Sequence, residues 1–284
     1  MLKANYWIQA ARPQTLVASL APVICSSFLC YKYYQFNFLI FFLTVLSAVL
    51  IQIMTNFIND LYDFKKGTDK ENRLGPDRMV QKGFISENEI KNAILLLLLL
   101  SVFTGLYLVI VGGWIILGIG LSSFLFAYLY TATKFSIAYN GLGEVFVFLY
   151  FGLIAAIGTA YLQTHSYLFD SLVIGCIFGF LNMSLLIINN LRDVNEDRKN
   201  NKKTLIVFFG KKFGFLELCI ALTVPIVIYI SFIDDLIYSS ISLLMFALYI
   251  LTSCYKSRKF IINSALPISS LYIVFFTIIL MYNL

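Results

Sequence analysis

Two stretches of this chain carry side chains whose types and spacing could do chemistry. The first, residues 56–69, contains carboxamides and carboxylates at helical offsets of 3, 4 and 7, namely Asn56, Asn59, Asp60 and Asp63, with Asp69 beyond a glycine. On a helix these offsets place the side chains on one face, with their oxygens converging. Hard divalent cations such as Mg²⁺ prefer oxygen ligands, and an ion held by few carboxylates keeps positions open for substrate phosphates. The stretch therefore predicts a magnesium and diphosphate site.

The second stretch, residues 189–198, repeats this arrangement. Asn190, Asp193 and Asp197 are spaced 3 and 4 apart, which again gives one helical face. In both stretches an apolar segment leads into asparagines, two aspartates and a basic loop. This likeness suggests an internal duplication.

The aspartates of the two stretches need positive charge around them, because like charges near lipid repel one another strongly. Two Mg²⁺ ions would balance the four candidate catalytic carboxylates, Asp60, Asp63, Asp193 and Asp197. A diphosphate bridging these ions would also need cationic or hydroxyl contacts to its outer oxygens. The candidates for these contacts are Lys134, Arg192, Arg198 and Tyr130.

The elements that position these residues are expected to be membrane helices. The chain of 284 residues is 60% hydrophobic and 13% charged, with a mean hydropathy of +0.85, which leaves too little polar surface for a soluble globule. Nine stretches are long enough to span a bilayer. They are approximately residues 14–31, 38–60, 92–111, 114–132, 141–163, 168–190, 214–233, 236–255 and 264–283. We expect an all-α integral membrane protein with a single domain over residues 1–284.

The basic residues predict how this bundle lies in the membrane. With nine spans, all of the 21 Lys and Arg except Lys32 fall in loops on one side, and seven lie in each of the loops that follow the two acidic stretches. The positive-inside rule makes that side cytoplasmic, with the N-terminus inside and the C-terminus outside. Both acidic stretches then end spans at the same membrane face.

A diphosphate site beside lipid predicts chemistry on a polyprenyl diphosphate. Departure of diphosphate from an allylic carbon leaves a carbocation that water would capture, so burial in a helix bundle would protect it until a carbon nucleophile arrives. The 27 Phe and 18 Tyr could offer ring faces to this cation, although such residues are also ordinary lipid-facing side chains. The five cysteines lack metal-binding spacing and His165 is the only histidine, which argues against a thiol or histidine metal site.

The two acidic stretches resemble known motifs. The patterns N-x-x-N-D-x-x-D-x-x-x-G-x-D and N-x-R-D-x-x-x-D are similar to the two aspartate-rich motifs of the UbiA superfamily of intramembrane prenyltransferases. Residues 75–83 and 139–144 are similar to runs found in its 1,4-dihydroxy-2-naphthoate polyprenyltransferase branch, which serves menaquinone synthesis. Lys203, Thr204, Leu205 and Gly210 are similar to the family's K-T-L-x-V-x-x-G run after the second motif. Residues 130–134, Tyr-Thr-Ala-Thr-Lys, depart from that branch toward the Y-x-x-x-K pattern of others.

The resemblance implies transfer of a polyprenyl group to 1,4-dihydroxy-2-naphthoate with loss of CO2 and diphosphate, giving demethylmenaquinol. It implies that two Mg²⁺ ions are bound by residues of both motifs: Asn56, Asn59, Asp60, Asp63, Asn190, Asp193 and Asp197. Four residues are candidates for the acceptor side: Arg78, Gln81, Glu144 and Arg12. Glu144 could equally be stabilised by a helix dipole, and Arg12 could equally anchor the chain at the membrane surface. The resemblance also implies a bacterial cytoplasmic membrane.

The residues alone are also consistent with other functions. The acceptor could be 4-hydroxybenzoate, homogentisate or haem. A cation-coupled transporter would also carry intramembrane acids, but its sites usually lie near the bilayer midplane in broken helices, whereas both stretches here end spans at one face. The expected partners are polyprenyl diphosphate, an aromatic acid and the lipid bilayer, with no nucleic acid and no protein partner.

Overall fold

Helices make up nearly all of the chain that the structure describes. The computed structural model describes residues 3–67, 77–133, 136–232, 237–255 and 259–284, and no strand occurs in these ranges. The helices are α1 (Lys3–Ala11), α2 (Pro13–Tyr33), α3 (Phe38–Lys65), α4 (Glu87–Leu129), η1 (Ile137–Tyr139), α5 (Gly143–Phe148), η2 (Leu149–Ile154), α6 (Ala155–Thr164), α7 (Phe169–Lys199), α8 (Leu205–Phe209), α9 (Lys211–Phe232), α10 (Ile237–Tyr255) and α11 (Lys259–Asn283).

Eight helical segments among these residues are long and apolar enough to cross a membrane, with α5, η2 and α6 forming one segment. Their mean hydropathy over 18 residues ranges from 1.4 to 2.9. Large apolar side chains face outward, such as Ile110 and Trp114, which are 80% and 86% exposed. Helices that are apolar on all sides are typical of membrane spans. The expected all-α membrane architecture is therefore confirmed, with eight or nine candidate spans.

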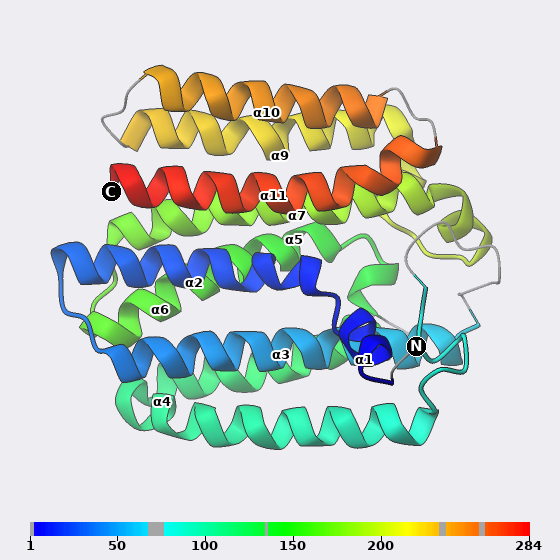
Figure 1. Cartoon of the computed structure of the whole chain (residues 1–284), viewed down its shortest axis with the longest axis horizontal. Helices are drawn as coiled ribbons and strands as arrows, with labels where there is room; N and C mark the ends of the chain where they lie inside the picture. The colour runs from blue at the N-terminus through cyan, green and yellow to red at the C-terminus, as the bar shows by residue number, and fades with distance from the viewer. Residues whose placement is uncertain (1–2, 68–76, 134–135, 233–236, 256–258) are drawn as a thin grey trace.

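Helix α4 consists of two parts joined at Gly113. Its 43 residues would extend about 65 Å as a straight helix, roughly twice the thickness of the hydrocarbon core. Gly113 has φ 64° and ψ −151°, which breaks the helix and is a conformation that only glycine adopts readily. Figure 1 shows the two parts of α4 folded back beside each other and beside α3. The break expected between residues 111 and 114 is present.

Helix α7 is the central helix of the bundle. It contacts α2, α5, α6, α8, α9 and α11, and 72% of its most apolar stretch of 18 residues is buried. Gly152 of η2 packs directly on α7, because a Cβ atom there would lie 2.5 Å from Gly179 Cα and from Gly175 O. Asn182 of α7 donates a hydrogen bond to Phe151 O over 2.7 Å, next to this contact. Small residues at helix contacts let backbones approach closely in membrane proteins.

The C-terminal ends of α3 and α7 lie at the same end of the bundle, together with α1 and the start of α5 (Figure 1). The two acidic stretches therefore come together, as their order along the chain and the number of intervening spans predicted.

Candidate active site

A polar cavity of about 400 Å³ lies between the ends of α3 and α7. Its walls come from the α1–α2 junction, the end of α3, residues 77–78, residues 130–131 and 138–144, the end of α7 with the loop that follows, and Leu266 of α11. Both acidic motifs contribute to its lining, which includes Asn59, Asp63, Asn190, Asp193 and Asp197. The structure thus gathers most of the proposed metal-binding oxygens around one space.

The first motif divides between two environments. Asn59 and Asp63 line the cavity. Asp63 is paired with Arg78, and its Oδ1 accepts a hydrogen bond from the Tyr139 hydroxyl over 3.1 Å. Asn59 accepts a hydrogen bond from the hydroxyl of Thr131. These contacts attach the loop after α3 and the loop after α4 to the end of α3.

Asn56 and Asp60 belong to the neighbouring strip of α3 and do not line the cavity. Asn56 donates hydrogen bonds to Ala11 O and Thr15 Oγ1 over 2.8 and 3.0 Å. Asp60 is 2% exposed, and its Oδ2 accepts a hydrogen bond from Met79 N over 3.2 Å. The expected convergence of all four side chains on one space is therefore only half realised, because α1 and the chain around Met79 cover this strip.

The second motif presents its carboxylates with basic partners. Arg192 donates to both oxygens of Asp193, over 2.6 and 2.7 Å. Lys202 lies 3.2 and 3.3 Å from the two oxygens of Asp197. Asn190 donates to Glu144 Oε1 over 2.9 Å, which joins α7 to the first turn of α5. Glu144, at 2% exposure, is thus buried in the cavity wall.

Lys66, at the end of α3, organises the loop that follows α4. Its Nζ donates to Thr131 O over 2.5 Å, to Thr133 O over 2.9 Å and to Ser136 Oγ over 3.1 Å. It also lies 4.2 Å from the centre of the Tyr139 ring. Burial lowers the pKa of Lys66, and the nearby charge of Asp63 opposes that shift. Lys66 therefore fixes the backbone on which Thr131 and Tyr139 reach the first motif.

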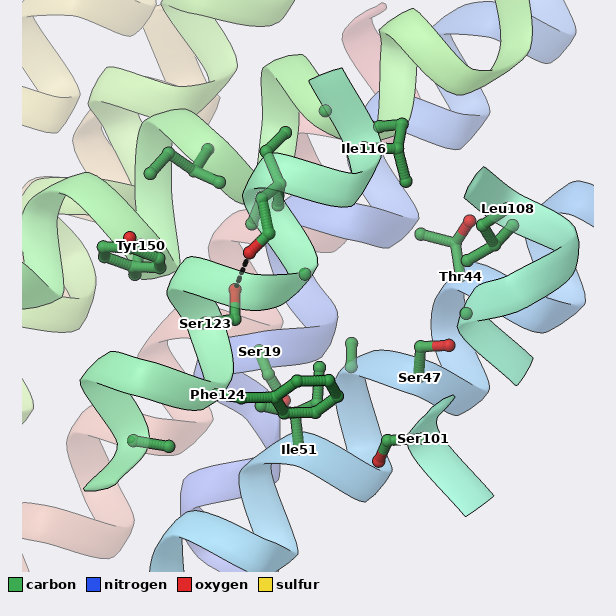
Figure 2. Close-up of a pocket in the computed structure, with 18 of the residues that line it drawn as sticks. Ser19, Thr44, Ser47, Ile51, Ser101, Leu108, Ile116, Ser123, Phe124 and Tyr150 are labelled. Carbon is green, nitrogen blue, oxygen red and sulfur yellow. Dashed lines mark hydrogen bonds between the residues drawn. The ribbon is translucent and has the colours of Figure 1, made fainter. Parts of the chain in front are cut away.

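A second, apolar cavity of about 340 Å³ lies within the bundle. Both parts of α4 line it, together with α2, α3 and the α5–η2–α6 segment. Figure 2 shows hydroxyl groups on its walls, but most of them bond to their own helices. Ser101 and Ser123, for example, each donate to the carbonyl oxygen four residues earlier, over 2.7 Å. A hydroxyl that is satisfied in this way leaves the wall effectively apolar.

Tyr130 lines both cavities, so the two spaces are neighbours that share this side chain in their walls. Burial raises the pKa of the Tyr130 hydroxyl, and the charges of Glu144 and Asp63 raise it further. The hydroxyl therefore stays protonated and can donate a hydrogen bond toward an anion.

The oxygen donors of the polar cavity suit Mg²⁺ in kind, since they are carboxylates and carboxamides. Within the described ranges, however, no three His, Cys, Asp or Glu side chains are gathered closely enough to hold an ion by themselves. Asp63, Asp193 and Asp197 each face a basic side chain instead. The donors fit the metal in chemical kind, and the carboxylates are paired with arginine and lysine in this structure.

The other candidates are distributed as follows. Arg12 and Arg78 line the polar cavity, whereas Gln81 does not. Arg198 is exposed and is not part of the lining, because it follows Asp197 by one residue and so points about 100° away from it around α7. Lys134, Asp69 and the first two residues of the 75–83 run lie outside the described residues.

Several residues that shape the cavity have no site role predicted from the sequence. They are Thr15, Lys66, Thr131, Tyr139 and Lys202. For Lys66 and Lys202 the available signal was closeness to a motif, since Lys66 follows Asp63 by three residues and Lys202 follows Asp197 by five. In the sequence alone, both count only as charges that set the orientation in the membrane.

Comparisons with known proteins place these features in context. The family model described as "UbiA prenyltransferase family" matches residues 19–281. The 1,4-dihydroxy-2-naphthoate octaprenyltransferase of Haemophilus influenzae is 38% identical over 240 residues, which cover 81% of this chain and 77% of that protein. The Escherichia coli protein of the same name is 38% identical over 217 residues, covering 74% and 70%. A UbiA homologue from Archaeoglobus fulgidus, solved with GPP and Mg²⁺ bound, superposes with a TM-score of 0.68 at 18% identity, covering 98% of this chain and 99% of that one.

Proposed function

Because this chain belongs to the UbiA prenyltransferase family, we propose that it transfers a polyprenyl group to 1,4-dihydroxy-2-naphthoate, with loss of CO2 and diphosphate, in menaquinone biosynthesis. The observation that carries the proposal is that a charged cavity and an apolar cavity share Tyr130 in their walls. A prenyl diphosphate has the same two parts, a charged head and an apolar tail, joined at the carbon that reacts.

The diphosphate end is assigned to the polar cavity. Asn59, Asp63, Asn190, Asp193 and Asp197 would hold two Mg²⁺ ions there, with Asp60 and Asn56 supporting α3 from behind. When bound, Mg²⁺ supplies positive charge that stabilises the departing diphosphate. Arg192 and Lys202 already lie in the cavity wall and would add charge-assisted hydrogen bonds to its oxygens. Tyr130 would donate a further hydrogen bond, and Lys134 remains a candidate contact.

The prenyl tail is assigned to the apolar cavity, which excludes water from the allylic carbon. Phe126, Phe146 and Tyr150 lie on its wall with ring centres 4.7 to 6.2 Å apart. Their faces would interact favourably with positive charge that develops on the allylic group. Arg78, Glu144 and Arg12 would shape the side from which the aromatic acid enters.

The reaction balances with these substrates alone. The allylic C–O bond breaks, and its electron pair leaves with the diphosphate. The ring carbon that bears the carboxylate then forms the new C–C bond to the prenyl group. The bond to the carboxylate breaks, CO2 leaves, and the electron pair restores the aromatic ring. No net proton is released when the acceptor enters as a carboxylate.

Placement in the membrane is part of the same proposal. We propose nine spans in a single domain, with the N-terminus and the polar cavity cytoplasmic and the C-terminus outside, in a bacterial cytoplasmic membrane. The break of α4 at Gly113 supports an odd number of membrane spans, since it lets that helix cross the membrane twice. The grouping of basic residues at the cavity end supports the orientation. A cytoplasmic reporter that is active when fused after Leu284 would contradict it.

An assay that separates aromatic acceptors tests the activity. Purified protein with Mg²⁺, a polyprenyl diphosphate and carboxyl-labelled 1,4-dihydroxy-2-naphthoate should release labelled CO2 and form a prenylated quinol. Parallel reactions with 4-hydroxybenzoate or homogentisate should give no product. Prenylated 4-hydroxybenzoate would instead identify a UbiA-type enzyme for another acceptor, the alternative that the Tyr130–Lys134 run leaves open.

A further inference from the structure

Gln52 is a buried carboxamide at the boundary between the two cavities. It lies on α3 one turn before Asn56, is 7% exposed, and lines the apolar cavity. Its Nε2 donates a hydrogen bond over 3.3 Å to Thr15 Oγ1, and Thr15 lines the polar cavity. Gln52 therefore connects the walls of both spaces, although neither acidic motif includes it.

The bonds around Thr15 fix which end of the carboxamide faces it. The Thr15 hydroxyl donates its one hydrogen to Arg12 O over 3.0 Å. Asn56 must present its NH₂ group, since it also donates to Ala11 O, and Thr15 accepts from it over 3.0 Å. Thr15 thus has no hydrogen left for Gln52 and can only accept, so Gln52 turns its NH₂ group toward Thr15. The carbonyl oxygen, Oε1, then points elsewhere.

No described residue donates a hydrogen bond to Gln52 Oε1, and the atom is buried. A buried carbonyl oxygen without a donor is unfavourable, and a polar atom of this kind at a binding cavity calls for an explanation. The neighbouring hydroxyl of Thr55, by contrast, donates to Ile51 O of its own helix over 2.8 Å. Gln52 Oε1 is an acceptor in need of a donor.

We propose that Gln52 Oε1 accepts a hydrogen bond from a ring hydroxyl of the aromatic acceptor, and that Gln52 is a positioning residue for this substrate. The inference rests on the proposed function. A prenyl diphosphate cannot supply the bond, because its ionised oxygens only accept and its tail is hydrocarbon. The ring hydroxyl of 1,4-dihydroxy-2-naphthoate next to the carboxylate pairs with that carboxylate, so the hydroxyl at position 4 is the one available.

This contact orients the ring relative to the prenyl group. With the hydroxyl at position 4 held at Gln52, the ring lies at the boundary of the two cavities, where the allylic carbon of the donor is placed. The edge with the carboxylate is then free to face the polar cavity, whose wall includes Arg12. Gln52 thereby favours an acceptor that has a hydroxyl meta to the ring carbon that reacts.

Comparison of two acceptor ligands tests the contact in the Gln52→Met variant, which keeps the length of the side chain. The variant should raise the KM for 1,4-dihydroxy-2-naphthoate about fivefold to tenfold, the effect expected from one net hydrogen bond. The inhibition constant of 1-hydroxy-2-naphthoate, which lacks the hydroxyl at position 4, should change less than about twofold, as should the KM for polyprenyl diphosphate. If Gln52 had a purely structural role, the substitution would weaken the binding of both ring ligands by the same factor.

The matched control is Gln163→Met, because Gln163 is also a buried glutamine but its carboxamide bonds to the Asn37 backbone, away from both acidic motifs. This variant should leave unchanged the ratio of the KM for 1,4-dihydroxy-2-naphthoate to the inhibition constant of 1-hydroxy-2-naphthoate. Equal changes for both ligands in Gln52→Met, or no change for either, would overturn the role of Gln52 while CO2 release by the unmodified protein upholds the proposed function. Failure of the unmodified protein to use 1,4-dihydroxy-2-naphthoate would overturn both.

Discussion

Tyr139 donates a hydrogen bond from its hydroxyl to Asp63 over 3.1 Å, and so joins the loop after α4 to the acidic motif at the end of α3. Lys66 lies on the face of the same tyrosine ring and donates to two carbonyl oxygens of that loop. The geometry of the first motif therefore depends on a loop some seventy residues further along the chain. This dependence, and the charge balance around the carboxylates, lead to the predictions below.

Lys66→Met should lower kcat about 10-fold to 100-fold, since the loss of several charge-assisted hydrogen bonds would let Thr131 and Tyr139 move away from the motif. Steady-state kinetics with both substrates would measure it. Lys65→Met is the matched control, because the neighbouring Lys65 pairs with Glu87 over 3.9 Å and lies 5.3 Å from the centre of the Tyr62 ring, instead of contacting the loop after α4. Equal kinetics for the two variants would show that Lys66 does not organise the loop.

Asp63→Asn should abolish measurable turnover, a loss of at least about 1000-fold, because the diphosphate would leave from a site with one carboxylate fewer to hold metal. Asp170→Asn provides the comparison within the same protein, since Asp170 lies in the first turn of α7 and bonds Tyr34 rather than the cavity. It should retain activity and amounts in the membrane close to those of the unmodified protein. Substantial turnover by Asp63→Asn would contradict its role in holding metal.

Removal of divalent cations should stop turnover without unfolding the protein. Arg78, Arg192 and Lys202 already balance Asp63, Asp193 and Asp197, so the carboxylates do not depend on metal to relieve their repulsion. Thermal unfolding in detergent with a chelator should shift by less than about 3 °C, equivalent to roughly 1 kcal/mol for a chain of this size. A large loss of stability would show that the metal is a structural part of the fold.

Ser123→Phe should restrict the length of the prenyl donor. Ser123 lies on the wall of the apolar cavity (Figure 2), and a phenyl group there would fill space assigned to the tail. The KM should rise for long polyprenyl diphosphates and change little for geranyl diphosphate, measured across a series of donors. Ser122→Phe is the neighbouring control, because Ser122 is not part of this lining. Uniform effects on all donors would argue against a tail in this cavity.

Much of this fold follows from the sequence because membrane helices are read from length and hydropathy alone. The break at Gly112 and Gly113 could be located because one helix of that length would be about twice as long as the bilayer is thick. The meeting of the two motifs followed from counting spans between them. Each of these inferences uses only local composition and the thickness of a membrane.

The hydrogen-bonding partners of the carboxylates could not be predicted from the sequence in the same way. Helical spacing puts Asn56, Asn59, Asp60 and Asp63 on adjacent strips of α3, but which strip faces the cavity depends on how α1 and residues near Met79 pack. The bond from Thr131 to Asn59 spans 72 residues. Such contacts depend on loop conformation, which hydropathy and spacing do not determine.

The break in α4 has a consequence for how an apolar product leaves the protein. The α4 segment is the least buried of the candidate spans, with 17% of its most apolar window inside the bundle, yet both of its parts line the apolar cavity. Along this wall a single layer of helix separates the cavity from the surroundings of the bundle. Under the proposed function, a demethylmenaquinol could pass sideways into the membrane by repacking of α4 side chains, and its tail would never meet water.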